Sequence, residues 1–477
     1  MSTLSRRELL ERSMWSAAAA AAATFKPAAA LASGPKAGPN EALRVAVVGV
    51  KGRGMNHVGD LAAMKDVQVA AIVDIDENII APAMKAIEKK GGNKPQYYKD
   101  IRKMLEDKSI DAVSIATTNH THALFSIWSV QAGKHVYVEK PCSHNVWEGR
   151  KLVEAARKYG KVVQHGTQSR SNKGMRDLVA YLHEGKLGKV KLARGLCYKS
   201  RKSIGTFPDS EPPAGVDYNL WLGPAPERPY NKNRFHYNWH WYWDYGNGDI
   251  GNQGVHEMDR ARWGLNKSEL PKRVLSVGGR VGYVDSGETP NTMVTVMDYG
   301  DSQLVFEVRG LETDAVKKCK IGVIFECENG FVVNPNYSGG TAFDKDGQPL
   351  QTFGGGGDHF GNWVAAIRSG KSADLNAEIL DGHISSAICH LANISVRVGE
   401  PMPLQDVKAF DGQDAGAEAF GRMKEHLAQN NVKGDAKVLV GRALAVDTAT
   451  EKIVGDEAAN KLLTREYRAP FVVPEQV

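Results

Sequence analysis

A buried strand that runs directly into a glycine-rich turn is the feature that most constrains the fold of this chain. Residues 43–49 (LRVAVVG) are mostly apolar, and the turn at 49–54 reads GVKGRG. Glycines in such a turn let backbone N–H groups approach a pyrophosphate at the N-terminus of the next helix. The turn departs from G-x-G-x-x-G, because a lysine stands where the second glycine is expected. We therefore expect a dinucleotide site built from Gly49, Lys51, Gly52, Arg53 and Gly54, in which Gly52 supplies the missing flexibility and Lys51 or Arg53 meets a phosphate.

An acid at the end of the next apolar segment supports this interpretation. Residues 69–74 (VAAIVD) form a second predicted strand, and Asp74 follows Gly54 by twenty residues. A carboxylate at this spacing accepts hydrogen bonds from the adenosine ribose hydroxyls and repels a 2′-phosphate. The sequence therefore favours NAD over NADP as the cofactor. The alternative is that Asp74 only caps the strand.

Short apolar runs alternate with helical patterns up to about residue 168. This alternation predicts a parallel sheet with crossover helices, which is a Rossmann NAD-binding domain over residues 43–168. The predicted strands are 43–49, 67–73, 110–116, 135–138 and 162–167, and the predicted helices are 52–64, 77–90, 121–132 and 145–158.

The pattern changes after residue 168. Several strands follow one another without intervening helices (272–282, 291–298, 303–309, 321–327 and 330–333), which favours a mostly antiparallel sheet. A helix (173–185) and a strand (189–198) are expected first, then a helix at about 251–264 before these strands, and two helices after them, at 358–369 and 376–398. We assign residues 169–400 to a second α/β domain for substrate binding and oligomerisation, and 401–477 to a polar, less regular C-terminal extension.

The first 32 residues have the pattern of a twin-arginine export signal. An Arg6-Arg7 pair precedes an alanine-rich stretch, Lys26 and a small-x-small sequence at 30–32. We expect residues 1–32 to be a Tat signal peptide and 33–42 a linker, which implies export to the periplasm by the Tat translocase. Because Tat carries folded proteins, the chain could bind its nucleotide before export. The alternative is an N-terminal helix with a chance arginine pair.

Composition excludes several other classes of protein. A chain of 477 residues is too long for one ordinary core, so two domains are expected. The formal net charge of +6 includes no basic block, which argues against nucleic acid as a partner. After the leader, no apolar run is long enough to span a bilayer. The five cysteines form no CxxC pair and no zinc spacing, so neither a metal site nor a disulfide framework is expected.

Three motifs resemble the Gfo/Idh/MocA family, which includes glucose–fructose oxidoreductase and inositol dehydrogenase. They are residues 133–141 (GKHVYVEKP), 117–122 (TTNHTH) and 248–259 (GDIGNQGVHEMD). The resemblance covers roughly 43–400 and implies a Rossmann domain followed by an α/β domain with a large open sheet. That sheet is often used for oligomer contacts, so a homo-dimer or homo-tetramer is expected. The resemblance adds these candidates for the cofactor site: Thr118, Asn119, Glu139, Lys140 and Gln168.

The resemblance also suggests catalytic residues. Removing a hydride from a carbinol carbon needs a base for the hydroxyl proton and a cation for the developing alkoxide. Lys140 supplies the positive charge, and His256 occupies the family's acid/base position. Their alternatives are a solvated surface lysine and a structural histidine. Many family dehydrogenases carry an acid four residues before the histidine, but this chain has Asn252, and Asp249 or Asp244 could substitute.

An aromatic segment precedes the histidine. Residues 235–245 contain seven aromatic side chains, which could stack on sugar rings; the alternative is a packed loop core or an oligomer contact. His236 and His240 have metal-ligand spacing, but no third ligand is nearby, so no metal is expected. Weaker candidates for substrate binding are Trp239, Trp241, Tyr242, Asp249 and His359.

These features lead to one favoured function and two alternatives. We expect an exported NAD-dependent oxidoreductase that transfers a hydride from a sugar, sugar derivative or polyol to a tightly bound nicotinamide. The first alternative is an NAD-containing glycoside hydrolase or lyase that works by transient sugar oxidation and elimination. The second is a non-catalytic sugar-binding protein, which the presence of Asn252 in place of an acid favours.

Overall fold

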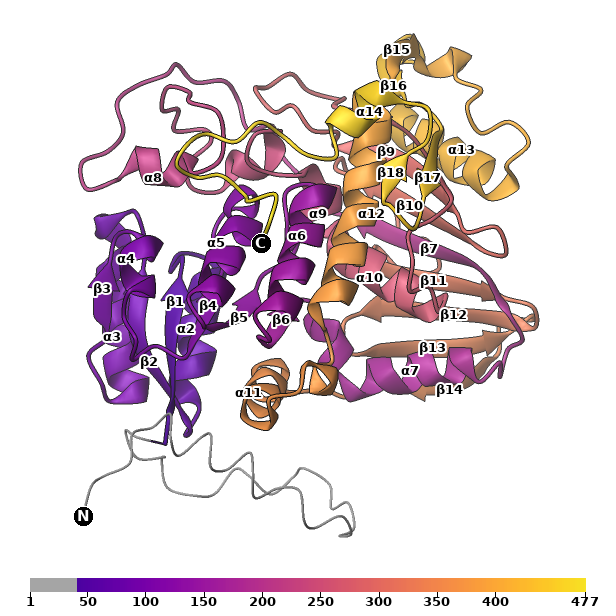
Figure 1. Ribbon diagram of the computed structural model, residues 1–477. Helices are drawn as coiled ribbons and strands as arrows, with labels where there is room; N and C mark the ends of the chain where they lie inside the picture. The colour runs from indigo at the N-terminus through magenta and orange to yellow at the C-terminus, as the bar shows by residue number, and fades with distance from the viewer. Residues whose placement is uncertain (1–40) are drawn as a thin grey trace, which may run out of the picture.

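The computed structural model describes residues 41–477 (Figure 1). The predicted Tat signal at 1–32 and most of the linker at 33–42 lie outside the described residues. Within residues 41–477, no helix has the length and apolar character needed to cross a membrane.

The N-terminal domain is a parallel sheet with helices packed against it. Its six strands in the described chain are ordered β3-β2-β1-β4-β5-β6, and every pairing is parallel. The strands are β1 (Leu43–Val48), β2 (Val67–Val73), β3 (Gln96–Tyr98), β4 (Ala112–Ile115), β5 (His135–Val138) and β6 (Val163–His165). The helices are α2 (Arg53–Ala63), α3 (Ile80–Gly91), α4 (Ile101–Leu105), α5 (Asn119–Gln131) and α6 (Val146–Lys158). The sequence did not predict β3 or α4, because elements this short show no period.

The strand order explains where a ligand can bind. β1 lies between β2 and β4, so the chain reverses its direction of winding at β1. Parallel sheets of this kind leave a crevice at the carboxyl ends of the strands where the order reverses. The glycine-rich turn after β1 and the acid after β2 both lie at that edge.

The second domain is built on a larger, mostly antiparallel sheet. In the described chain it has twelve strands, ordered β14-β13-β12-β11-β7-β10-β9-β8-β16-β15, with β17 paired to β8 and β18 to β17. Only β7 and β10 run parallel among these pairings in residues 41–477. The strands are β7 (Val190–Tyr198), β8 (Arg273–Gly279), β9 (Thr292–Asp298), β10 (Gln303–Arg309), β11 (Ile321–Cys327), β12 (Gly330–Asn336), β13 (Gly339–Asp344), β14 (Pro349–Phe353), β15 (Glu400–Pro403), β16 (Lys437–Val440), β17 (Leu444–Asp447) and β18 (Lys452–Ile453). The predicted fold class is thereby confirmed.

Strand alternation places helices on both faces of this sheet. On β9, Met293 and Met297 pack into one core with α7 (Lys173–His183), α10 (Gly254–Gly264) and α12 (Ile379–Arg397). Val294 and Val296 point to the other face and pack against α13 (Asp414–Gln429). Figure 1 shows α12 between the large sheet and the N-terminal domain, and α7 and α10 packed over strands of the large sheet.

The C-terminal extension is more regular than the sequence analysis expected. Besides α13, it contains β15 to β18 and α14 (Glu457–Lys461), and β16 and β17 pair with β8 of the large sheet. The last residues then return to the N-terminal domain, where Phe471 packs into the same core as α5 and α6. Figure 1 shows the C-terminus beside these two helices. The extension therefore connects the two domains.

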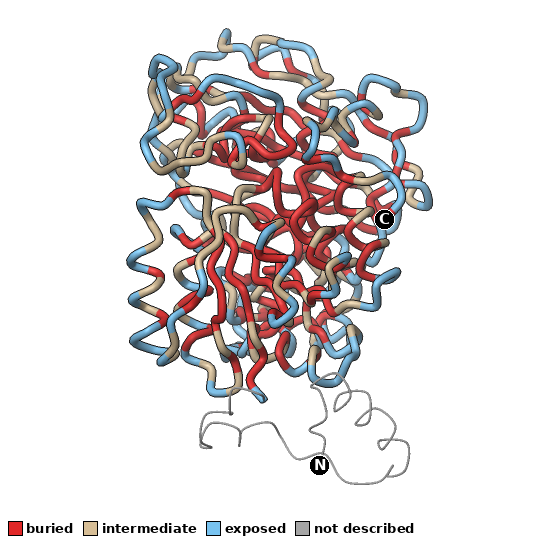
Figure 2. The backbone as a smooth tube through the Cα atoms, turned by 60° about the vertical axis from the view of Figure 1, so that its left-hand side comes forward, coloured by how far each residue is buried: buried red, intermediate tan, exposed pale blue. Residues whose placement is uncertain are grey.

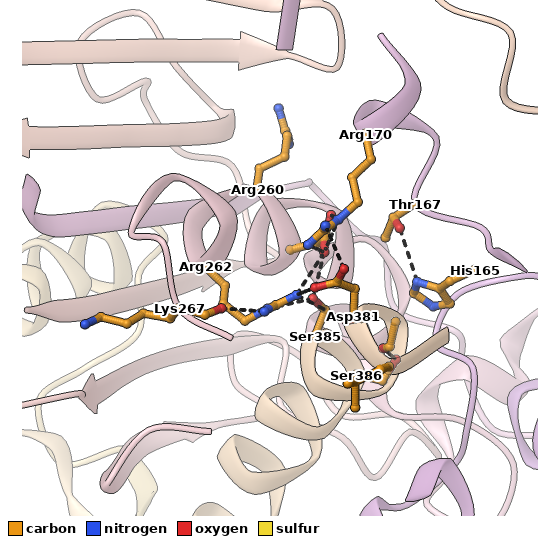
Figure 3. Close-up of polar contacts among 12 residues, drawn as sticks. His165, Thr167, Arg170, Arg260, Arg262, Lys267, Asp381, Ser385 and Ser386 are labelled. Carbon is orange, nitrogen blue, oxygen red and sulfur yellow. Dashed lines mark hydrogen bonds and ion pairs between the residues drawn. The ribbon is translucent and has the colours of Figure 1, made fainter. Parts of the chain in front are cut away.

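A buried ion-pair cluster connects the segment that follows β6 to α10 and α12 (Figure 3). Arg170 follows β6, and its Nε donates to both oxygens of Asp259 on α10, at 3.0 and 2.9 Å. Ser385 on α12 donates its hydroxyl to Asp259 Oδ1 at 2.7 Å, and Arg262 Nη2 lies 2.7 Å from Asp381 Oδ1. Burial opposes ionisation of Asp259, but the Arg170 guanidinium holds its pKa below the usual value. Figure 2 shows buried backbone through the centre of the molecule, with exposed backbone around it.

Candidate active site and cofactor cavity

A cavity of about 470 Å³ lies at the carboxyl ends of β1, β2, β4 and β5. Its walls come from the N-terminal domain, from the 220–240 region of the second domain and from the C-terminal extension. The predicted residues that line it are Gly49, Lys51, Gly52, Arg53, Asp74, Thr118, Asn119, Glu139, Lys140, Trp239 and Asn252. Segments far apart in the sequence are thus brought into one site.

The glycine turn is shaped for close approach of a ligand. Gly49 has a φ of 80°, and a Cβ there would lie 2.7 Å from the carbonyl oxygen of Ala116. Gly54 does not line the cavity, but a Cβ on it would lie 1.7 Å from the carbonyl oxygen of Gly49. Gly52 has a φ of 57° and immediately precedes α2. Only glycines therefore allow this turn to pack against β4 and to lead directly into the helix.

Asp74 at the end of β2 holds the turn in place. Its Oδ2 accepts a hydrogen bond from the backbone N–H of Val50 at 2.8 Å, and its Oδ1 accepts one from Asp76 at 3.1 Å. Burial raises the pKa of Asp74 to about 6. The carboxylate lines the cavity and keeps lone pairs for ribose hydroxyls.

Glu139 is the centre of a hydrogen-bonded group in the cavity wall. Its Oε1 accepts from Arg53 Nε at 2.8 Å, from Gln168 Nε2 at 3.0 Å and lies 3.1 Å from His57 Nε2. Burial opposes the charge of Glu139, but His57 and Arg53 lower its pKa well below the usual range. Gln168 also donates to the Tyr137 hydroxyl at 2.9 Å and does not line the cavity. Glu139 and Gln168 therefore position Arg53 on the glycine turn.

Lys140 contacts Asn252, the residue at which the sequence departs from the family pattern. Its Nζ donates to the backbone carbonyl of Asn252 at 2.8 Å and lies 3.5 Å from Asn252 Oδ1. Burial lowers the pKa of Lys140, while the neighbouring Glu139 carboxylate raises it. A neutral amide beside the ammonium group does not stabilise its charge as a carboxylate would. The site thus keeps Lys140 closer to losing its proton.

His256 lies close to Lys140 and Asn252, but the helix that carries it differs from the predicted one. The predicted helix at 251–264 is two helices, α9 (Gly248–Asn252) and α10, which are separated at Gln253. Nothing in residues 41–477 hydrogen-bonds the buried Nδ1 of His256, and its ring lies 4.8 Å from that of Tyr337. Burial and the charge of Lys140 lower the pKa of His256 well below its usual value, so the imidazole is neutral. His256 does not line the cavity.

Neither acid named as a substitute stands at the position of Asn252. Asp249 is buried and forms an ion pair with Arg201, whose Nη2 lies 2.8 Å from Asp249 Oδ1. Asp244 pairs with Arg228. Both carboxylates are therefore neutralised by arginines rather than by Lys140.

Most of the aromatic segment forms a loop core. Trp239 and Tyr242 pack with Trp221 and Tyr245 in one hydrophobic cluster. Trp241 is buried under the guanidinium of Arg201, and neither Trp241 nor Tyr242 lines the cavity. The packed-core alternative describes these side chains better than sugar stacking does. His359 is also structural, because its Nε2 lies 2.9 Å from the carbonyl oxygen of His165 and its Nδ1 lies 2.6 Å from the Ser171 hydroxyl.

The second domain covers the nucleotide end of the cavity. The backbone N–H of Glu77 donates to Gly215 at 3.1 Å, and that of Asp217 donates to Ile75 at 2.9 Å. His236 Nε2 lies 2.8 Å from Asp76 Oδ2. Phe471 lines the same cavity from the C-terminal extension. Sequence reasoning did not find Trp221, His236 or Phe471 as lining residues, since each comes from a segment with no nucleotide-binding pattern.

The two histidines with metal-ligand spacing have protein partners. No group of three or more His, Cys, Asp or Glu side chains within the described residues is arranged to hold a metal ion. His236 pairs with Asp76, and His240 Nδ1 lies 2.5 Å from the carbonyl oxygen of Tyr237.

Comparison with known families accounts for this architecture. The oxidoreductase family with an NAD-binding Rossmann fold (GFO_IDH_MocA) matches residues 43–167, and its C-terminal alpha/beta domain matches 195–427. The chain belongs to the Gfo/Idh/MocA oxidoreductase family. The predicted family and the predicted NAD cofactor are thereby confirmed.

Individual relatives match only part of this chain. Inositol 2-dehydrogenase of Salmonella typhimurium is 28% identical over 176 residues, which are 36% of this chain and 50% of the relative. A glycosyl hydrolase family 109 protein of Shewanella sp. (strain ANA-3) is 33% identical over 171 residues, which are 33% of this chain and 38% of the relative. The chain thus spans half the length or less of these curated relatives.

A solved structure supports the fold alone. The WlbA dehydrogenase of Bordetella pertussis, in complex with NADH and UDP-GlcNAcA, has a TM-score of 0.53 and 18% identity. The match covers 73% of this chain and 94% of that one.

The residues of this chain fit NAD. The glycine turn leaves room for a pyrophosphate, and Lys51 and Arg53 are exposed beside it. Asp74 would meet the ribose, and Thr118 and Asn119 line the opposite wall. Lys140 lies in the same cavity, where it can reach a substrate next to the nicotinamide.

Proposed function

We propose that this protein is an exported NAD-dependent oxidoreductase that acts on a CH–OH group of a sugar, sugar derivative or polyol. The observation that carries the proposal is the position of Lys140. Its ammonium group lines the same cavity as the glycine turn and Asp74, and its contact with Asn252 fixes it at the wall. A cation held beside the nucleotide site suits hydride chemistry at a hydroxyl carbon.

Each residue has a distinct role in this proposal. Bound NAD supplies the hydride acceptor. Lys140 donates a hydrogen bond to the substrate hydroxyl and stabilises negative charge on its oxygen as the proton leaves. When Lys140 is instead neutral, a state that burial favours by lowering its pKa, its amine can accept that proton. His256 is neutral and does not line the cavity, so Lys140 is the proposed proton acceptor.

The cofactor is proposed to stay bound throughout turnover. A protein outside the cytoplasm meets no expected pool of free NAD, so a redox-neutral cycle with a second substrate suits an exported enzyme. The cover over the nucleotide end, made by Gly215, His236 and Phe471, supports slow release. Periplasmic localisation, passage through the Tat translocase and assembly as a homo-dimer or homo-tetramer belong to the same proposal.

Absorbance of the purified protein near the reduced-nicotinamide band tests this function. We expect the protein to carry nucleotide after purification, and its absorbance to change when the oxidisable sugar or polyol is added from a panel. Lys140→Met should retain the nucleotide and lose the change. A protein that carries no nucleotide and turns over only with added NAD would refute the tight-binding cycle. Loss of nucleotide from the Lys140→Met protein would contradict the role of Lys140 in chemistry.

The second candidate is a redox-neutral glycoside hydrolase or lyase. The amide of Asn252 in place of an acid favours it, and so does the similarity to a glycosyl hydrolase family 109 protein. Release of nitrophenol from aryl glycosides without added NAD would support this activity. If the Lys140→Met protein showed unchanged binding and unchanged activity, a non-catalytic sugar-binding role would be favoured instead.

A further inference from the structure

A second cavity, separate from the cofactor cavity, lies where the 243–247 segment, α12 and the C-terminal extension meet. Its volume is about 320 Å³. Polar side chains from distant parts of the chain line it, among them His144, Asn247, His390, Asn393, Arg397 and Arg465. None of these residues lines the cofactor cavity.

Three side chains of this cavity carry buried polar atoms that lack partners. His144, His390 and Asn393 are 9%, 3% and 4% exposed. Among the described residues, His144 Nε2, His390 Nδ1 and Asn393 Oδ1 have no hydrogen-bond partner. Buried polar side-chain atoms are nearly always hydrogen-bonded in native proteins, because an unpaired one costs free energy. Three such atoms around one cavity indicate that a ligand completes them.

The surrounding contacts show what kind of partner two of these atoms need. Arg465 Nη1 lies 3.3 Å from His144 Nδ1, and a guanidinium can only donate. His144 Nδ1 therefore accepts, and its unpaired Nε2 carries the proton and acts as a donor. Asn393 Nδ2 donates to the backbone carbonyl of Asn247 at 2.9 Å, which leaves its Oδ1 as an acceptor. A donor and an acceptor together suit a hydroxylated molecule.

The charges at the cavity indicate a negative ligand. Within residues 41–477, neither Arg397 nor Arg465 forms an ion pair with a carboxylate. The guanidinium of Arg397 lies 4.8 Å from the ring centre of Trp243, at the wall of the cavity. Asp244, Lys461 and Glu466 also line the cavity; Asp244 is already paired with Arg228, and the charge of Lys461 balances that of Glu466. Guanidinium groups bind carboxylates and phosphates through paired hydrogen bonds.

We propose that this second cavity binds a small hydroxylated oxyanion, such as a sugar acid or a sugar phosphate. Asn247 links this cavity to the wall of the cofactor cavity. Asn247 Oδ1 accepts from Asn119 Nδ2 at 3.1 Å, and Asn119 lines the cofactor cavity. The same Asn247 precedes α9, whose last residue contacts Lys140. The site therefore goes beyond the proposed oxidoreductase function and does not depend on it.

Calorimetric titration of the purified protein with glucuronate, glucose 6-phosphate and glucose tests the proposal. At least one of the two anions should bind, and the neutral sugar should bind about tenfold more weakly or not at all, since a hydrogen bond to a charged group contributes on this scale. The preferred anion distinguishes a carboxylate ligand from a phosphate ligand. Arg397→Gln should weaken the binding of that anion by about tenfold.

Matched variants keep the test specific. Arg176→Gln changes an exposed helical arginine far from the cavity lining and should leave binding unchanged, and Lys140→Met should also leave it unchanged. The proposal is overturned if neither anion binds, if glucose binds as well as the anions, or if Arg397→Gln has no effect. Loss of anion binding in the Lys140→Met protein would place the ligand in the cofactor cavity and would equally overturn it. None of these outcomes would test hydride transfer, which is measured by nicotinamide absorbance.

Discussion

Replacing Asn252 by aspartate should raise the pKa of Lys140. The two side chains are 3.5 Å apart at Nζ and Oδ1, and aspartate is nearly isosteric with asparagine. Two unit charges 3.5 Å apart attract by about 1.2 kcal/mol in water and by about 4.7 kcal/mol at an effective dielectric constant of about 20. Because about 1.36 kcal/mol corresponds to one pKa unit, the expected rise is about 1 to 3.5 units. The 2.8 Å bond from Lys140 to the backbone carbonyl of Asn252 is kept, so mainly the charge changes.

The pKa of Lys140 can be measured without knowing the substrate. The rate of acylation of Lys140 by acetic anhydride, followed across pH by peptide mass spectrometry, reports the fraction of neutral lysine. Asn329→Asp, in the turn between β11 and β12, provides the same change in charge away from the cavity. If the pKa of Lys140 in Asn252→Asp moves no more than in Asn329→Asp, or moves downward, the argument that the amide keeps the lysine poised for proton loss is wrong.

Further predictions concern cofactor binding, the buried ion pair between Arg170 and Asp259, and the release of NAD. Burial raises the pKa of Asp74 to about 6, so its carboxylate loses its charge as pH falls through that value. NAD affinity measured by calorimetry should therefore drop below pH 6. Asp74→Asn should remove this dependence on pH. Asp259→Asn removes the fully buried carboxylate that pairs with Arg170 and leaves only the half-exposed Asp381, 3.3 Å away, so it should lower the free energy of unfolding in urea by about 3–5 kcal/mol. Asp381 is half-exposed, so Asp381→Asn should lower the free energy of unfolding by only about 0–1 kcal/mol. Equal decreases for the two variants would contradict the argument that burial makes the Asp259 pair more important. Phe471→Ala should speed the release of bound NAD in a stopped-flow chase, whereas the exposed Val472→Ala should not.

The sequence predicted the fold wherever local patterns were strong. The strands 303–309 and 321–327 have the predicted bounds, because their apolar runs are clearly delimited. β14 was missed because four of its five residues are exposed at the edge of the sheet. α13 could have been found, since Ala419, Phe420, Met423 and Leu427 recur at helical spacing and form its buried face.

The site was predictable only where its residues belong to a motif. The glycine turn, Asp74, Lys140 and Asn252 meet in one cavity as their motifs indicate. The contact between Glu139 and Arg53 spans 86 residues, and no local pattern specifies such a pairing. The break between α9 and α10 was not predicted, although Gly251 and Gly254 on either side of Gln253 disfavour one continuous helix.

The path of the C-terminal extension has a consequence for the order of events in the cell. Phe471 lines the cofactor cavity and residues between 461 and 466 line the second one, so each cavity needs a segment that follows both domains in the sequence. The nucleotide can therefore be enclosed only after this segment has been synthesised and has folded back onto the Rossmann domain. If the protein is exported in the folded state, as proposed, the cofactor would be acquired in the interval between this folding step and translocation. A molecule that crossed the membrane before loading would have to work where no nucleotide is supplied.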